Sequence, residues 1–152
     1  FSRDLKWLGQ QPLVVDLPGF TLVHASLHHP ESFDYLNTDI TARFHFEEQK
    51  TPVCFFGHTH RPEVILLQKD QVRWGLLHEG EVLLDRSHPC AINVGSVGQP
   101  RDSDSRAAYG IFDTKHNRFT LRRVTYDIEE AIRRIREAGL PEENALRLRR
   151  GE

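Results

Sequence analysis

Apolar runs along the first two thirds of the chain have the length and spacing of β-strands. Apolar residues on both sides of Pro-Gly at 18–19 predict a β-hairpin over residues 12–24, with His24 where its second strand ends. Residues 52–56 are wholly apolar and are closed by Gly57, the pattern of a strand buried on both faces. This strand is expected to deliver the residues after it to the end of a sheet.

Short apolar runs separated by turn residues continue after residue 60. They predict four strands that pair antiparallel as neighbours in one sheet, at 64–67, 72–76, 81–84 and 90–94. A glycine-bearing loop at 95–101 follows, and two final strands are predicted over 107–113 and 119–126.

Helical patterns frame this strand-rich region. Asp127 is a good N-cap with Glu130 three residues on, and apolar residues recur at helical spacing until Gly139. A second helix is expected from Pro141, and residues 28–50 predict a loop followed by one or two short helices. The predicted fold class is an α/β sandwich with a mainly antiparallel sheet, helices at its outer face and C-terminal helices.

Composition narrows the classes of protein. Lys and Arg total 20 against 22 Asp and Glu, and this balance argues against a general nucleic-acid or membrane-surface binder. Cys54 and Cys90 are the only cysteines, too few for a disulfide framework, and no apolar run approaches the ~20 residues that span a bilayer. We therefore expect a soluble, cytoplasmic protein whose buried Cys54 is a core residue.

Residues 1–152 have the length of one domain, and nothing within them suggests a boundary. The sequence has no methionine, including at position 1, whereas a complete translated chain starts with one unless it is processed. We expect residues upstream of Phe1 to be missing, so that the chain is one partial domain.

His58 and His60 are the first candidates for chemistry. Two residues apart on an extended segment, both side chains would leave the same side of the chain, with α-carbons roughly 6.5 Å apart. Two ions about 3.5–4 Å apart could each take one imidazole, as in many phosphatases and nucleases. A pair of surface turn histidines is the alternative, although Gly57, Thr59 and Pro62 restrict the turn.

Three motifs together resemble the second half of the calcineurin-like metallophosphoesterase family. They are Val-His-Ala-Ser at 23–26, Gly-His-Thr-His-Arg-Pro at 57–62 and Ile-Asn-Val-Gly-Ser-Val-Gly at 92–98. The chain is similar in particular to the small bacterial and archaeal phosphodiesterase-type branch, over residues 13–113. The resemblance implies the C-terminal half of an αββα sandwich.

The resemblance also implies roles for individual residues. His24 and His58 would bind one metal ion and His60 the other, in a centre of two divalent ions such as Mn, Fe, Zn or Ni. Asn93, Gly95 and Ser96 match a loop that borders the family's site, although a tight turn would explain them equally. The implied reaction is hydrolysis of a phosphate ester, a phosphodiester or nucleotide in particular, by a water that both metals activate.

The family's first half supplies an Asp-x-His pair, a Gly-Asp-x-x-Asp segment and a Gly-Asn-His-Asp/Glu segment, which this sequence lacks. Three neutral imidazoles cancel none of the four positive charges of two divalent ions, so a paired site needs carboxylates or a bridging hydroxide. We expect this chain alone to be inactive and to require the N-terminal half as its partner. Two alternatives remain: a non-catalytic interaction scaffold of the same fold, and a zinc-binding domain using the three histidines.

Other polar residues are open to two interpretations. Arg101 and Arg106, just beyond the glycine loop, could hold the phosphate of the substrate, or could form salt bridges with Asp102 and Asp104. His28 and His29 follow His24 closely and could reach the substrate, or could be solvated on a polar loop. The remaining histidines lack ligand spacing and are expected at the surface: His78, His88 and His116.

Overall fold

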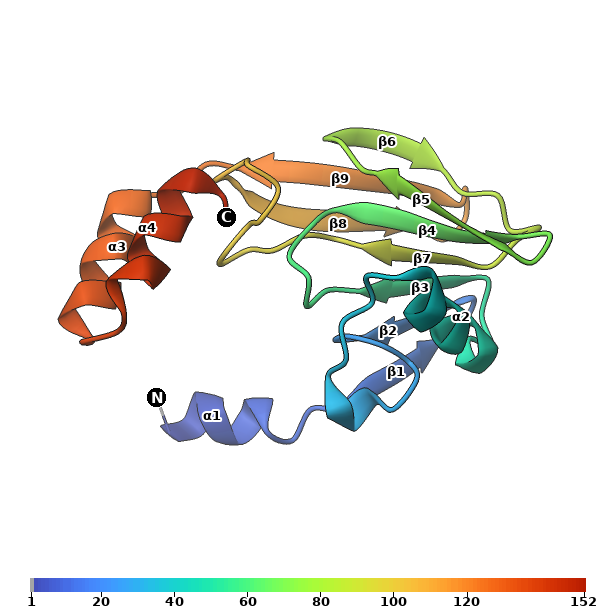
Figure 1. The fold of residues 1–152 in the computed structure, drawn as a ribbon, viewed down its shortest axis with the longest axis horizontal. Helices are drawn as coiled ribbons and strands as arrows, with labels where there is room; N and C mark the ends of the chain where they lie inside the picture. The colour runs from blue at the N-terminus through green and yellow to red at the C-terminus, as the bar shows by residue number, and fades with distance from the viewer. Residues whose placement is uncertain (1) are drawn as a thin grey trace.

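The computed structural model describes residues 2–152 and contains two β-sheets. The larger sheet has the strand order β1-β2-β3-β7-β4-β5, and the smaller has the order β6-β9-β8 (Figure 1). The strands are β1 (Val14–Leu17), β2 (Phe20–Val23), β3 (Val53–Phe56), β4 (Glu63–Gln68), β5 (Gln71–Leu76), β6 (Gly80–Leu83), β7 (Cys90–Asn93), β8 (Ala107–Asp113) and β9 (Arg118–Val124).

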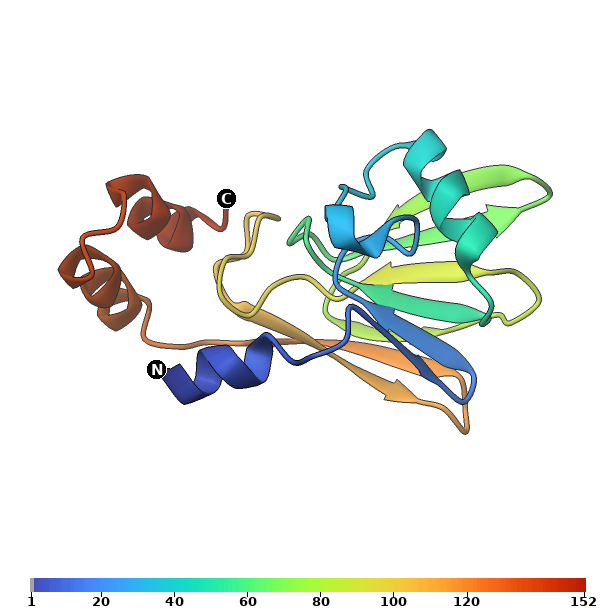
Figure 2. The same ribbon diagram turned by 90° about the horizontal axis from the view of Figure 1, so that it is seen from below.

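The helices lie on one face of the larger sheet and beyond the ends of the strands (Figures 1 and 2). They are α1 (Ser2–Leu8), the 3-10 turn η1 (Pro30–Ser32), α2 (Asp39–Glu48), α3 (Ile128–Glu137) and α4 (Glu142–Arg150). Among residues 2–152, no helix is long and apolar enough to cross a membrane.

The core consists of two apolar layers on opposite faces of the larger sheet. Val53 and Phe55 point into the layer shared with the smaller sheet, whereas Cys54 and Phe56 point into the layer beneath α2. All four are buried, as the prediction of a strand covered on both faces requires. Burial also raises the pKa of the Cys54 thiol, which suits an inert core residue.

Three neighbouring strands of the larger sheet run parallel. β2 pairs with β3, and β3 with β7, in the same direction, whereas β1, β4 and β5 join antiparallel. The carboxyl ends of β2, β3 and β7 therefore meet at one edge of the sheet. This arrangement brings His24, the turn after Phe56 and the loop after Asn93 together.

The predicted fold class is confirmed, with two differences in detail. The four central strands do not form one antiparallel sheet, because β6 pairs with β9 in the smaller sheet and β7 runs parallel to β3. The C-terminal helices do not cover a sheet face: α3 and α4 pack on each other around Ile132 and Leu148. Helix α1 was not predicted from the sequence.

His45 on α2 is fully buried and anchors the loop that follows His24. Its Nδ1 accepts a hydrogen bond from the backbone N–H of Leu27 at 3.2 Å, so the ring must be neutral at this nitrogen. Burial lowers the pKa of His45 from 6.5 to about 4, against a smaller opposite effect of Gln49. The fold thus depends on an uncharged imidazole.

This burial predicts a loss of stability in acid. Between pH 6.5 and about 4 the unfolded chain binds a proton at His45 that the folded chain does not, so stability falls as the pH falls. The penalty should approach about 3 kcal/mol near pH 4. Urea unfolding at pH 7 and pH 4.5 should show that the free energy of unfolding falls less with pH in His45→Gln than in the wild type. The exposed substitution His116→Gln is the control. An equal fall in His45→Gln and in the wild type would contradict this account.

Candidate functional site

His24 and His58 converge at the carboxyl ends of β2 and β3. His24 Nε2 lies 3.2 Å from His58 Nδ1, and the two rings meet edge to face. Two nitrogens that each lie about 2.05 Å from one tetrahedral ion are about 3.3 Å apart. The two imidazoles are therefore spaced as two ligands of a single ion.

The tautomer of His60 is fixed by a hydrogen bond. Its Nδ1 lies 2.8 Å from the carbonyl oxygen of Gln99, an acceptor, so Nδ1 carries the proton and Nε2 keeps its lone pair. A carbonyl partner of this kind orients metal-ligating histidines in many sites. His60 can thus offer Nε2 to a ligand.

Both histidines of the turn are poised in the neutral form that binds metals. Burial is the main cause that lowers the pKa of His58, with His24 and Arg101 adding to it. Burial likewise lowers the pKa of His60, partly offset by the hydrogen bond to Gln99. A neutral imidazole binds a cation without first losing a proton.

The turn itself is not the extended segment expected from the sequence. His58 and His60 adopt left-handed φ values of 65° and 61°, so the α-carbon spacing derived for a strand does not apply. Such angles are uncommon outside glycine and cost of order 1–3 kcal/mol each. Gly57, expected to take the unusual angle, has no positive φ.

Asn93 at the end of β7 holds this strained turn. Its Nδ2 donates to the Gly57 carbonyl at 2.8 Å and to Thr59 Oγ1 at 2.7 Å, and its Oδ1 accepts from the Gly95 N–H at 2.9 Å. The side chain is fully buried. These contacts favour the structural alternative for Asn93 over contact with a substrate.

The loop after Asn93 packs tightly against the turn. Gly95 has φ 80°, and a Cβ there would lie 2.9 Å from Pro62 Cγ and Ala108 Cβ, so a side chain does not fit. Ser96 Oγ accepts from the Gln99 N–H at 2.9 Å and so shapes the segment whose carbonyl meets His60. Ser96 thus has a structural task whether or not it also meets substrate.

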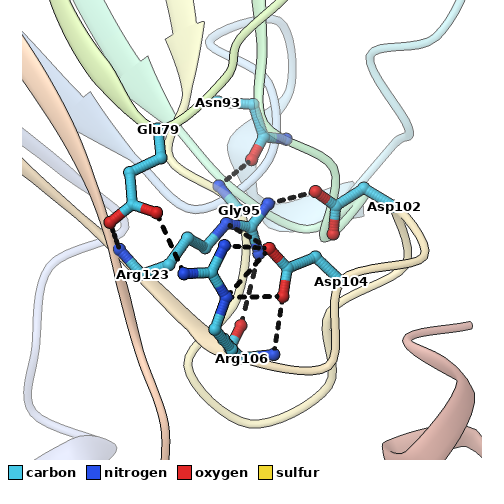
Figure 3. Close-up of polar contacts among 7 residues, drawn as sticks. All are labelled: Glu79, Asn93, Gly95, Asp102, Asp104, Arg106 and Arg123. Atoms are coloured by element: carbon cyan, nitrogen blue, oxygen red, sulfur yellow. Dashed lines mark hydrogen bonds and ion pairs between the residues drawn. The ribbon is translucent and has the colours of Figure 1, made fainter.

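The two arginines proposed for substrate binding differ in their contacts. Arg106 is engaged by carboxylates: Asp104 at 2.7 Å and Glu79 at 2.9 Å (Figure 3). Arg101 forms hydrogen bonds to Gln99 Oε1 and its charge reaches His58 and His60. Arg101 lies beside the imidazoles and, within the part of the chain that the structure describes, forms no ion pair with a carboxylate, whereas Arg106 belongs to the ion-pair cluster.

Arg123 completes this cluster and was missed by the sequence analysis. Its side chain is 4% exposed; it pairs with Asp102 and lies 3.7 Å from Asp104 (Figure 3). The loop that carries both carboxylates also donates the Arg101 N–H to the His60 carbonyl and the Ser103 N–H to Gly151. In the sequence, Arg123 resembles a solvent-facing residue of a strand, and no local signal distinguishes it.

The remaining candidates lie outside the imidazole group. His78 and His116 are exposed, and His88 is half-buried beside Asp85. His28 stacks on Phe44. Within residues 2–152, no cluster of three or more His, Cys, Asp or Glu side chains is arranged to hold a metal ion. The donors present fit part of a metal centre, and they include no carboxylate.

Comparison with known proteins supports the fold and its class. A crystal structure of a metallophosphoesterase from Sphaerobacter thermophilus matches the whole chain with a TM-score of 0.87 and 36% identity, over 63% of its own length. An uncharacterized protein of Methanocaldococcus jannaschii is 37% identical over 146 residues, 93% of this chain and 57% of the relative. A hypothetical protein of Pyrococcus horikoshii shares the fold, with a TM-score of 0.66 at 17% identity over 97% of this chain and 54% of its own. No protein-family model matches the chain.

The chain has a metallophosphoesterase fold, and its resemblance to the calcineurin-like metallophosphoesterases is confirmed. In general, the metallophosphoesterase fold is one of hydrolases that use divalent metal ions. The chain spans 57% of the length of the Methanocaldococcus protein and 63% of that of the Sphaerobacter protein. The assignment to a branch within the family stays a prediction.

The hydrogen bonds of Asn93 predict that replacing its side-chain nitrogen by oxygen destabilises the fold. Asn93→Asp keeps the shape and the bond from Gly95 but removes both N–H donations. The Gly57 carbonyl then accepts only from the Thr59 N–H and faces a carboxylate oxygen, and Thr59 Oγ1 keeps only its bond to Glu63. We expect a loss of roughly 1–3 kcal/mol in the free energy of unfolding, measured by urea denaturation. The exposed substitution Asn37→Asp is the control, and equal stability of the two variants would contradict the role given to Asn93.

Proposed function

We propose that this chain supplies the imidazole side of a two-metal centre that hydrolyses a phosphate ester, a phosphodiester or nucleotide in particular. His24 and His58 would bind one ion, and His60 would bind the other through Nε2. The observation that carries the proposal is the 3.2 Å approach of His24 Nε2 to His58 Nδ1 at the carboxyl ends of parallel strands.

Divalent ions at such a centre would supply an activated water and neutralise charge on the phosphoryl oxygens. The chain's own residues bind and orient: the Gln99 carbonyl fixes the His60 tautomer, and Asn93 holds the turn. Arg101, beside the imidazoles, is the side chain placed to attract an anionic substrate. Mn, Fe, Zn and Ni are all compatible with these ligands.

The anionic ligands would come from residues outside this chain. Three neutral imidazoles leave the charge of two divalent ions uncompensated, and the relatives are longer than this chain. An N-terminal half with its own carboxylates would therefore be this chain's partner in one domain. Without it, we expect weak metal binding and no turnover.

The ligand assignment predicts the effect of removing one imidazole. In the full protein with added Mn²⁺, His58→Ala should lower hydrolysis of bis-p-nitrophenyl phosphate by at least about 100-fold, because loss of outer partners alone costs about 10–100-fold. Metal content, measured by elemental analysis, should fall as well.

His116→Ala is the matched control, since His116 lies on the surface beside Asp113. It should retain activity and metal. Unchanged turnover in His58→Ala would refute the ligand assignment, and bound metal without turnover of any phosphate ester would favour a zinc-binding or scaffold role instead.

A further inference from the structure

An aromatic cavity adjoins the imidazole pair. It has a volume of about 310 Å³ and is lined by Ser26, His28, Asp34, Tyr35, Thr41 and Phe44. Tyr35 and Phe44 are 46% and 42% exposed, so part of each ring is accessible to a ligand. The remaining lining is polar, so the cavity is suited to a planar group with hydrogen-bonding edges.

The cavity lies next to the candidate metal site. The Tyr35 ring lies 4.3 Å from the His58 ring, centroid to centroid, and Phe33 packs edge to face on His24 at 5.7 Å. Ser26, which lines the cavity, is two residues beyond His24. A substrate whose phosphate meets metal held by the imidazoles would therefore extend past Tyr35.

One carboxylate in the cavity favours ligands that donate hydrogen bonds. Asp34 lies between the two aromatic residues that touch the imidazoles, and within residues 2–152 it has no ion-pair partner. A carboxylate accepts hydrogen bonds from amino groups of bases and repels a second anion. Guanine, with two adjacent N–H donors on one edge, matches it better than uracil.

We propose that this cavity binds the base of a nucleotide substrate, with the ring against Tyr35 and Phe44 and a donor-bearing edge such as that of guanine toward Asp34. The inference rests on the proposed phosphoesterase function, because it makes the phosphate the group that meets the metal ion held by His24 and His58. Stacking on exposed aromatic side chains tolerates any base, so Phe44 and Tyr35 would give affinity and Asp34 would give preference.

The experiment compares substrates with and without a base in the full protein with Mn²⁺. Phe44→Ala should raise KM for 2′,3′-cyclic GMP roughly 5–160-fold, because stacking of one base is worth about 1–3 kcal/mol. Its kcat, and its turnover of the ring-free diester glycerophosphoethanolamine, should stay within about twofold, as expected of a contact remote from the reacting phosphate. Phe44→Leu, which keeps an apolar side chain on α2, should show the same KM effect if the fold is intact.

Two further variants refine the test. Asp34→Asn should reduce the preference for 2′,3′-cyclic GMP over 2′,3′-cyclic UMP. Tyr109→Ala removes a ring of similar exposure, 43%, on the distant strand β8. It should leave the KM of both cyclic nucleotides unchanged. A KM for the cyclic nucleotide that is unaffected by Phe44→Ala and Phe44→Leu, or a loss shared equally by glycerophosphoethanolamine, would overturn the base-binding assignment.

Direct binding separates this inference from the proposed function. If no phosphate ester is hydrolysed, calorimetric titration with GMP still tests the cavity. Weaker GMP binding by Phe44→Ala than by Tyr109→Ala would support base binding although the hydrolase proposal had failed. Equal GMP binding by both variants, or none by the wild type, would overturn the assignment.

Discussion

The side-chain amide of Asn93 joins three segments that the parallel strands bring to one edge of the sheet. Its N–H groups hold Gly57 and Thr59, and its oxygen holds Gly95, so β3, β7 and the glycine loop are tied at a single buried group. The left-handed angles of His58 and His60 cost free energy that these bonds offset. The convergence of His24 and His58 depends on this geometry.

The elements of the fold could be read from the sequence because their patterns are local. The apolar run of β3, the Pro-Gly turn of the first hairpin and the Asp127 N-cap each specify one element by short-range chemistry. Which strands become partners is decided by contacts distant in sequence. The pairing of β6 with β9, and the parallel pairing of β3 with β7, therefore escaped prediction.

The candidate site divides in the same way. His24, His58 and His60 were identified from motifs. The structure brings His24 into contact with His58, and His60 lies two residues after His58 in the same turn. The angles of the turn were not foreseen, since they depend on an amide 34 residues away from Thr59. Arg123 was missed because its burial depends on two carboxylates of another loop. The exposed aromatic residues were not candidates because only the structure shows that Tyr35 lies against His58.

The central claim is that His24 and His58 share one metal ion while His60 serves a second. Anomalous diffraction from Mn²⁺-soaked crystals of the full protein tests it directly. The account predicts one ion bonded to both His24 Nε2 and His58 Nδ1, and another, about 3.5–4 Å away, bonded to His60 Nε2. A single ion held by all three imidazoles, or metal bound elsewhere with these histidines free, would contradict it.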